Sequence, residues 1–229
     1  MIDLKKYEPK SYADLFYGNS ESKSGIEELV MGHTPFPEYG KSGILLYGIW
    51  GTGKTTLAKI LPEEIEYNKA DEQLAASYDF IKCQQGFTGP QVMTLVGNIL
   101  SKISFNTSGL HYIILDEVDN LTIAAQKSLK SAMNTKNAIF LLTTNYLQKV
   151  DKGVQDRCVS VEMNAASNQQ MQMYVKNIAA DMNVELTDEE IDSIISTANG
   201  SMREVTYRAV VLTGRKQRGL NVIVMRPVA

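Results

Sequence analysis

Cysteine is scarce in this sequence, long apolar runs are missing, and neither sign of charge is in large excess. Cys83 and Cys158 are the two cysteines among 229 residues, which excludes a disulfide framework, and they lack the spacing of a metal-ligand set. We therefore expect two buried or half-buried thiols in a reducing compartment. The length allows one large domain or two smaller ones, and 44% hydrophobic residues suffice for a genuine core.

No apolar run approaches the length of a membrane span, and residues 1–10 are charged rather than signal-like. We expect a cytoplasmic protein with no membrane partner. The formal net charge of -3 argues against nucleic-acid binding by bulk charge. Basic residues outnumber acids from Arg203 onward, and this stretch forms either a local basic face or a solvated helix surface with a charged tail.

What the sequence does contain is a glycine-rich motif after the apolar run 44–47. Residues Gly48-Ile49-Trp50-Gly51-Thr52-Gly53-Lys54-Thr55 match G-x-x-x-x-G-K-[ST], the P-loop whose backbone N–H groups surround nucleotide phosphates. Lys54 would reach the β- and γ-phosphates, and Thr55 would ligate Mg²⁺. A glycine-rich turn without a ligand is the alternative. The predicted nucleotide contacts are Gly48, Gly51, Thr52, Gly53, Lys54, Thr55 and Thr56.

Apolar runs predict strands over residues 44–47, 78–83, 112–115, 138–144 and 159–163, with helical spacing between them. One of these helices begins with a capping box at Thr88 and Gln91 and continues to Ile103. Strands that alternate with helices indicate an α/β fold, here a P-loop domain with a five-stranded parallel sheet sandwiched by helices. Ligands of such sheets bind at the carboxyl ends of the strands, where the motif residues fall.

Beyond Ala165 the strand pattern stops and three amphipathic helices follow. Capping boxes pair Thr187 with Glu190 and Ser201 with Glu204, while Gly200 and Gly214 end helices. The sequence therefore predicts an α/β domain over residues 1–164, a helical domain over 165–214 and a basic tail over 215–229.

A second group of polar residues decides what happens to a bound nucleotide. Asp116 and Glu117 end a buried strand, where Asp116 can hold Mg²⁺ and Glu117 can polarise an attacking water. Asn145 ends the next strand and would orient that water. The alternatives are a solvated acidic loop and a turn-forming Asn.

Two arginines are candidates for contact with phosphate. Arg157 lies at a chain reversal before the fifth strand and is either an arginine finger for a neighbour's γ-phosphate or a surface residue paired with Asp156. Arg203 occupies the first turn of a helix, where the macrodipole disfavours a cation, which suggests phosphate sensing.

The order of these motifs resembles the AAA+ ATPases, and most of all the small subunits of sliding-clamp loaders, the replication factor C family and its relatives in tailed phages. The residues that carry it are Tyr7-Glu8-Pro9, the P-loop, the stretch from Asp116 to Gln126, Thr143-Thr144-Asn145, Gln155-Asp156-Arg157-Cys158 and Gly200-Ser201-Met202-Arg203. The resemblance spans residue 6 to about residue 212.

The resemblance implies ATP and Mg²⁺ as cofactors and an ATPase subunit that acts in a ring or spiral around primer-template DNA and opens a ring-shaped clamp. It implies that Asn145 is the first sensor, that Arg157 acts in trans, and that Arg203 folds from the helical lid onto the phosphates. It also implies adenine contacts from Tyr7, Pro9, Phe16 and Tyr17.

Several positions depart from the family pattern. Glu8 replaces the usual Arg, Trp50 replaces a compact P-loop residue, Asp156 replaces Ser, and residues 84–87 lack a basic residue often found near DNA. No collar domain follows residue 214, so the chain is a fragment or its assembly is held by other contacts. Trp50 is expected either to meet a neighbouring subunit or to pack over its own loop.

Two other functions stay open: a helicase loader or replication initiator, and a nucleotide-gated scaffold with little hydrolysis. The candidates for DNA contact are Lys127 and Lys130, for which a solvated helix face is an equal reading.

Overall fold

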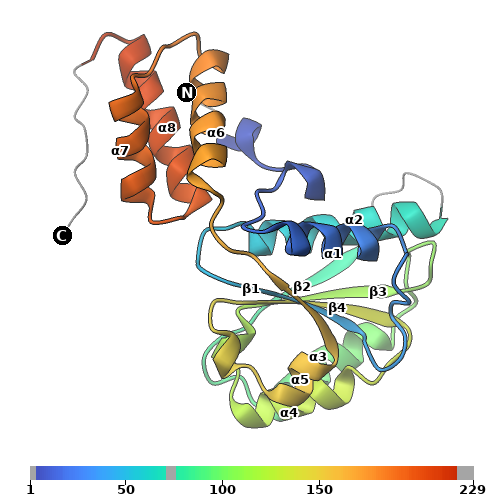
Figure 1. Cartoon of the computed structure of the whole chain (residues 1–229). Coiled ribbons are helices and arrows are strands. Elements are labelled where there is room, and N and C mark those ends of the chain that lie inside the picture. Colours follow the sequence, from blue (N-terminus) through green and yellow to red (C-terminus); the bar gives the residue numbers. More distant parts are fainter. Residues whose placement is uncertain (1–3, 71–75, 221–229) are drawn as a thin grey trace. The chain divides into compact units, whose positions relative to one another are not determined.

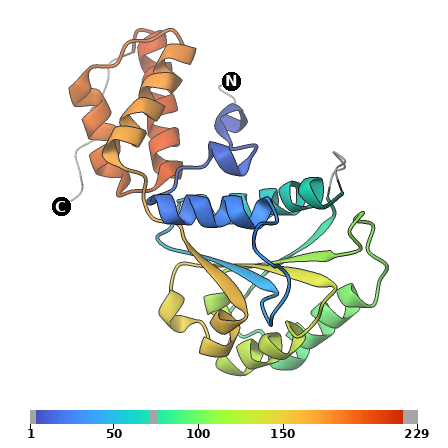
Figure 2. The same cartoon turned by 45° about the vertical axis from the view of Figure 1, so that its right-hand side comes forward.

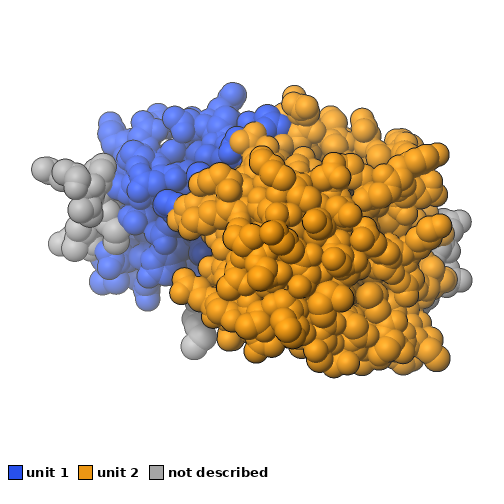
Figure 3. All heavy atoms as spheres, turned by 90° about the horizontal axis from the view of Figure 1, so that it is seen from below, with its two compact units in different colours: residues 1–19, 49–53, 164–229 blue, residues 20–48, 54–163 orange. Residues whose placement is uncertain are grey.

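A computed structural model describes residues 4–70 and 76–220 of the chain (Figure 1). Contacts divide it into two compact units, one made of residues 20–48 and 54–163 and the other of residues 1–19, 49–53 and 164–229 (Figure 3). The N-terminal segment and residues 49–53 thus group with the C-terminal helices. The predicted domain bounds, which follow the order of the chain, do not include this grouping. Within the described residues, none of the helices combines the length and apolar character needed to cross a bilayer.

The larger unit is built on a parallel sheet of five strands, as the apolar runs predicted. The strands are β1 (Gly43–Tyr47), β2 (Tyr78–Lys82), β3 (His111–Asp116), β4 (Ala138–Thr144) and β5 (Cys158–Glu162), and their order in the sheet is β2-β3-β4-β1-β5. Strands β3 and β4 are buried along their whole length, because both of their faces are covered.

Helices cover both faces of this sheet, which confirms the predicted sandwich. In both views α1 (Ser20–Val30) and α2 (Lys54–Ala70) lie on one face, while α3 (Gly89–Leu100), α4 (Ile123–Ala132) and α5 (Lys152–Asp156) lie on the other (Figures 1 and 2). Apolar side chains of β3 and β4 pack there against Val96 of α3 and Leu129 of α4. This core holds the carboxyl ends of the strands in place.

Helix α3 begins as predicted but ends earlier. The Gln91 carboxamide oxygen accepts a hydrogen bond from the Thr88 N–H at 2.8 Å, which fixes the first turn. The helix ends at Leu100, and Ile103, which the spacing assigned to it, is 86% exposed. The reason is a competing loop, in which Ser104 Oγ and Asn106 Nδ2 both donate to the carbonyl of Leu110.

The smaller unit contains α6 (Asn168–Asp181), α7 (Asp188–Ala198) and α8 (Met202–Gln217), which pack around a shared apolar core. The capping box of Thr187 and Glu190 is present, and Asn199 and Gly200 take positive φ after α7. The N-terminal segment forms short 3-10 turns at Leu4–Tyr7 and Tyr12–Asp14.

Two predictions about α8 are wrong. Ser201 Oγ accepts from the Glu204 N–H, but the Glu204 carboxylate binds Arg208 at 3.1 Å, and the Ser201 N–H donates to Ala198, so the box is only half formed. Gly214 does not end the helix, because it is buried against the core and the chain continues in helical conformation to Gln217. Part of the predicted basic tail is therefore helix, and residues 221–229 lie outside the described residues.

Candidate nucleotide-binding site

The P-loop follows β1 and needs glycine for two separate reasons. Gly48 has φ of 140° and Gly51 has φ of 76°, conformations that residues with a side chain rarely adopt. A Cβ at Gly48 would also collide with the carbonyl of Met163, and one at Gly51 would collide with the hydroxyl of Ser201. Gly48 and Gly51 are thus required both by their backbone conformation and by the lack of space for a side chain.

Lys54 is the first residue of α2, so its positive charge stands beside the positive end of the helix dipole. Its ammonium lies 2.9 Å from the carbonyl oxygen of Gly48, at the start of the same loop, and the residue is buried. Thr52 Oγ1 donates to the carbonyl of Ile49 at 3.0 Å, which closes the turn between them. The lysine of the motif is therefore buried and bonded to the first residue of the motif.

Asp116, the last residue of β3, is buried and accepts two hydroxyl hydrogen bonds. Thr55 Oγ1 donates to its Oδ1 at 2.7 Å, and Thr143 Oγ1 of β4 donates to the same atom at 2.8 Å. The two predicted Mg²⁺ ligands therefore lie side by side. The described residues hold no group of three His, Cys, Asp or Glu side chains suited to a metal. A hydroxyl and one carboxylate fit Mg²⁺, which keeps several waters and phosphate oxygens as its other ligands.

Glu117 leaves the strand with a sharp change of backbone direction. Its φ of 60° is left-handed, which costs on the order of 1–3 kcal/mol for a residue with a side chain. Its N–H donates to Thr143 Oγ1 at 3.0 Å, so the hydroxyl that binds Asp116 also holds this strained residue. Thr143 thus joins the two acidic positions.

Asn145 follows β4 at the same edge of the sheet. The register pairs Tyr47 with Thr144, so the P-loop and Asn145 begin where neighbouring strands end. Thr144 Oγ1 donates to Asp119 at 2.7 Å and accepts from the Tyr146 N–H at 2.9 Å, which fixes the backbone on both sides of Asn145. The predicted phosphate, metal and water positions therefore share one edge.

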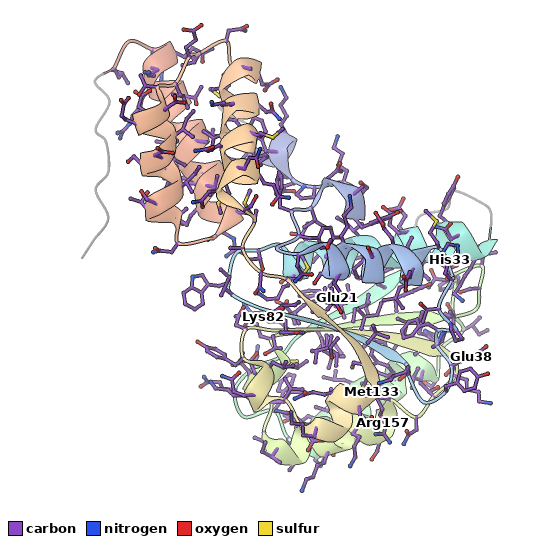
Figure 4. All side chains as sticks on the ribbon, viewed as in Figure 1. Glu21, His33, Glu38, Lys82, Met133 and Arg157 are labelled. Carbon is purple, nitrogen blue, oxygen red and sulfur yellow. The ribbon has the colours of Figure 1, made fainter. Side chains whose placement is uncertain are left out.

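Arg157 lies at the other edge, directly before β5, whose first residue pairs with Gly43 at the start of β1. Figure 4 places it and Lys82, the last residue of β2, toward opposite ends of the sheet. Its Nε donates to Asn134 Oδ1 at 2.9 Å, and its Nη1 donates to the carbonyl of Gly153 at 3.0 Å. These neutral partners orient the guanidinium, and the alternative of a pair with Asp156 is not found among the described residues.

Comparison with known proteins agrees with this geometry. A model of the ATPase family associated with various cellular activities (AAA) matches residues 44–165, more than half of the chain. The chain belongs to the AAA family. It is 29% identical over 209 residues to mouse replication factor C subunit 5, covering 87% of this chain and 57% of that protein.

Replication factor C small subunit 1 of Pyrobaculum arsenaticum is 30% identical over 214 residues, covering 88% of this AAA chain and 58% of the relative. The chain thus spans less than two thirds of the length of these relatives. Among solved structures, the RuvB Holliday junction branch migration motor of Thermotoga maritima matches with a TM-score of 0.66 and 19% identity, over 93% of this chain and 65% of that one. That likeness concerns the fold.

The N-terminal segment of the AAA chain is held by the helical unit to which it belongs. The Tyr7 hydroxyl donates to Asp181 at 2.8 Å, Lys6 Nζ donates to both oxygens of the same carboxylate, and the Tyr174 hydroxyl donates to the Tyr7 carbonyl. Burial first, and then the bond to Asp181, raise the pKa of Tyr7 to about 12. Phe16 meets Tyr174 edge to face at 5.2 Å.

The other predicted base contacts differ in exposure: Tyr17 is buried and Pro9 half-buried. Arg203 exposes its side chain on the first turn of α8, while its N–H donates to the carbonyl of Gly51 at 3.2 Å. Residues 201–203 therefore touch the P-loop through backbone and hydroxyl, and the guanidinium of Arg203 stays in solvent. Trp50 is 61% exposed, so it does not pack closely over its own loop.

Both cysteines are buried, as predicted. Burial raises the pKa of each thiol to about 12, so both remain protonated at neutral pH. Of the candidate DNA contacts on α4, Lys127 is exposed and Lys130 is half-buried.

Sequence reasoning gave no role to Thr143, Asn120 or Gln126. Thr143 could have been noticed as a hydroxyl inside an otherwise apolar strand. Gln126 is 1% exposed, and its carboxamide donates to the carbonyls of Leu121 and Lys149 and accepts from the Asp151 N–H. Its side chain therefore connects α4 to the segment before α5, a contact that local sequence patterns do not predict.

Proposed function

We propose that this chain hydrolyses ATP as one subunit of a ring or spiral that loads a sliding clamp onto primer-template DNA. The observation that carries the proposal is the placement of Arg157 at the edge of the sheet opposite the P-loop. The two edges are separated by strands of at least five residues, about 16 Å long. Because one chain cannot bring its own arginine to its own phosphates, a neighbouring copy must supply it.

The phosphates bind to the N–H groups of the loop, and Lys54 neutralises their charge. Thr55 and Asp116 would hold Mg²⁺, which would neutralise negative charge of the phosphates. Glu117 polarises the attacking water and takes its proton, while Asn145 orients the same water from the end of β4. Arg157 of the neighbour stabilises the charge of the transferred phosphoryl group.

The base and lid contacts complete the nucleotide site in this proposal. Tyr7, Pro9, Phe16 and Tyr17 lie by the adenine, and Arg203 senses the phosphates. The anchoring of Tyr7 to Asp181 supports a base-binding segment that moves together with the helices.

The contact with the clamp is proposed for the loop between α3 and β3. Phe105 and Ile103 on this loop are 93% and 86% exposed. The loop is ordered by Asn106, whose side chain bonds the backbone of Ser77 and Leu110. An ordered loop with two apolar side chains in water is suited to insertion into an apolar pocket of a partner. Lys127 and Lys130 are the proposed contacts with DNA phosphates.

The test is ATP turnover with and without a cognate clamp and primer-template DNA. We expect both together to raise turnover, and Ile103→Ser with Phe105→Ser to remove the clamp's share while leaving the DNA share. Stimulation by a replicative helicase but not by a clamp would favour the helicase-loader alternative. DNA affinity that does not fall with salt would remove the phosphate contacts.

A further inference from the structure

The carboxylate of Glu117 has a side-chain partner three residues later. Asn120 ends the single 3-10 turn Val118–Asn120, and its Nδ2 lies 3.3 Å from Glu117 Oε2. Its own N–H donates to the Glu117 carbonyl at 3.0 Å. Among the described residues, no other side chain donates to this carboxylate. The turn therefore folds the carboxamide back onto the residue that begins it.

The same carboxamide is braced from the sheet. Asn120 Nδ2 also lies 3.3 Å from the carbonyl oxygen of Cys83, the residue after β2. The N–H of Cys83 donates to the Asp116 carbonyl at 2.9 Å and so extends the pairing of β2 with β3. Cys83 is buried, which makes this carbonyl a fixed point. The Asn120 nitrogen thus connects a rigid acceptor to a charged one.

The backbone of Glu117 is left-handed, and its N–H and its carbonyl are both hydrogen-bonded, but these bonds do not fix the side chain. Thr143 Oγ1 accepts its N–H and fixes the main chain, but it does not touch the carboxylate. A glutamate side chain has three rotatable bonds, and a carboxylate that polarises water has to stand within hydrogen-bond distance of it. Thr143 and Asn120 together hold both ends of the residue.

We propose that Asn120 is a positioning residue, which orients the Glu117 carboxylate toward the attacking water. This inference rests on the proposed function of Glu117. A carboxamide suits the place because its two N–H groups serve Cys83 and Glu117 without adding charge. An Asp here would lose both donors and repel the base, and a Lys would compete for its negative charge.

The experiment compares Asn120→Ala and Asn120→Asp with the wild type in ATP turnover and in affinity for a fluorescent ATP analogue. We expect kcat to fall about tenfold or more in both variants, while KM and analogue affinity stay within about twofold, because the P-loop is untouched. Asn68→Ala is the matched control, since Asn68 is exposed on α2 and, among the described residues, its side chain bonds only the carbonyl of Glu64.

A double-variant cycle separates positioning from a structural role. In single-turnover measurements on a Glu117→Gln background, Asn120→Ala should lower the residual rate by less than about twofold, because its effect passes through Glu117. An equal loss in both backgrounds would overturn the inference, as would wild-type turnover in Asn120→Ala and Asn120→Asp. Loss of analogue affinity or of folding in both variants would show a structural role and overturn it as well. If Glu117→Gln itself hydrolyses ATP normally, the proposed function of Glu117 fails first, and this inference fails with it.

Discussion

Charged residues at the carboxyl ends of the strands and at their amino ends take different kinds of hydrogen-bond partner. At the carboxyl ends of the strands Asp116 accepts hydrogen bonds from the hydroxyls of Thr55 and Thr143, both from the same unit. At the amino ends of the strands Arg157 is held by an amide oxygen and a carbonyl, and no carboxylate of the described residues pairs with it. The difference fits the proposed function, in which the carboxyl ends receive phosphate and Mg²⁺ and Arg157 faces an anion of another chain.

The variant Arg157→Ala tests the role of the arginine at the amino ends of the strands. We expect turnover to fall by about 10³-fold or more with ATP binding intact, since the arginine acts on charge that develops in the neighbour's site. Arg157→Lys keeps the charge but loses the planar fork, and should recover only part of the rate. Steady-state kinetics and analogue binding measure both. Normal hydrolysis by a monomeric Arg157→Ala variant would remove the trans role.

The variant Glu117→Gln tests the role of the acid at the carboxyl ends of the strands. We expect kcat to fall about 10²–10⁴-fold while ATP still binds. Equilibrium binding and single-turnover hydrolysis distinguish the two effects. A variant that loses binding as well would mean that Glu117 holds the site together rather than acting on water.

Mixing these two variants tests whether the edges work in different chains. A subunit with Arg157→Ala keeps its own Glu117, and a neighbour with Glu117→Gln can supply the missing arginine. We expect the mixture to recover on the order of a tenth or more of wild-type turnover, while each variant alone stays inactive. Failure to recover in a mixture shown by mass measurement to co-assemble would contradict the arrangement.

A smaller effect is expected at Thr143, whose hydroxyl donates to Asp116 and accepts from the Glu117 N–H. Thr143→Val should lower the free energy of unfolding by about 1–3 kcal/mol, because it leaves the Glu117 N–H without its acceptor. Urea denaturation measures this change, and turnover should fall by about tenfold. Thr213→Val is the control, because that buried hydroxyl bonds only the Ala209 carbonyl within its own helix.

The smallest effect on stability is expected at Tyr7, which belongs to the smaller unit rather than to the sheet. Its folded-state pKa of about 12 exceeds the ordinary value of 10.0, so its hydroxyl adds stability that is complete below pH 10.0 and is lost as the pH rises toward 12. Tyr7→Phe should therefore be less stable than the wild type at neutral pH and nearly equal to it at the alkaline limit. Urea midpoints across that range test this, with the exposed Tyr39→Phe as control. A constant difference at every pH would contradict it.

Much of the fold followed from local pattern, and some of it did not. Apolar runs predicted the five strands, most plainly β3 and β4, where burial of both faces leaves an uninterrupted apolar run. The end of α3 was misjudged, because Ile103 keeps helical spacing while the loop after Leu100 is decided by the side chains of Ser104 and Asn106. Gly214 misled for a similar reason, since a glycine ends a helix only where the chain must turn.

The sequence by itself determined the P-loop, the strands and the order of the acidic and basic motifs, because each is a property of neighbouring residues. Only the tertiary structure decided which partner each polar side chain takes. Arg157 binds Asn134 rather than the adjacent Asp156, and Asp116 binds Thr143 from another strand. Such choices depend on which distant segments meet in the fold, because a hydrogen bond needs its two atoms within about 3 Å and no sequence spacing specifies that distance.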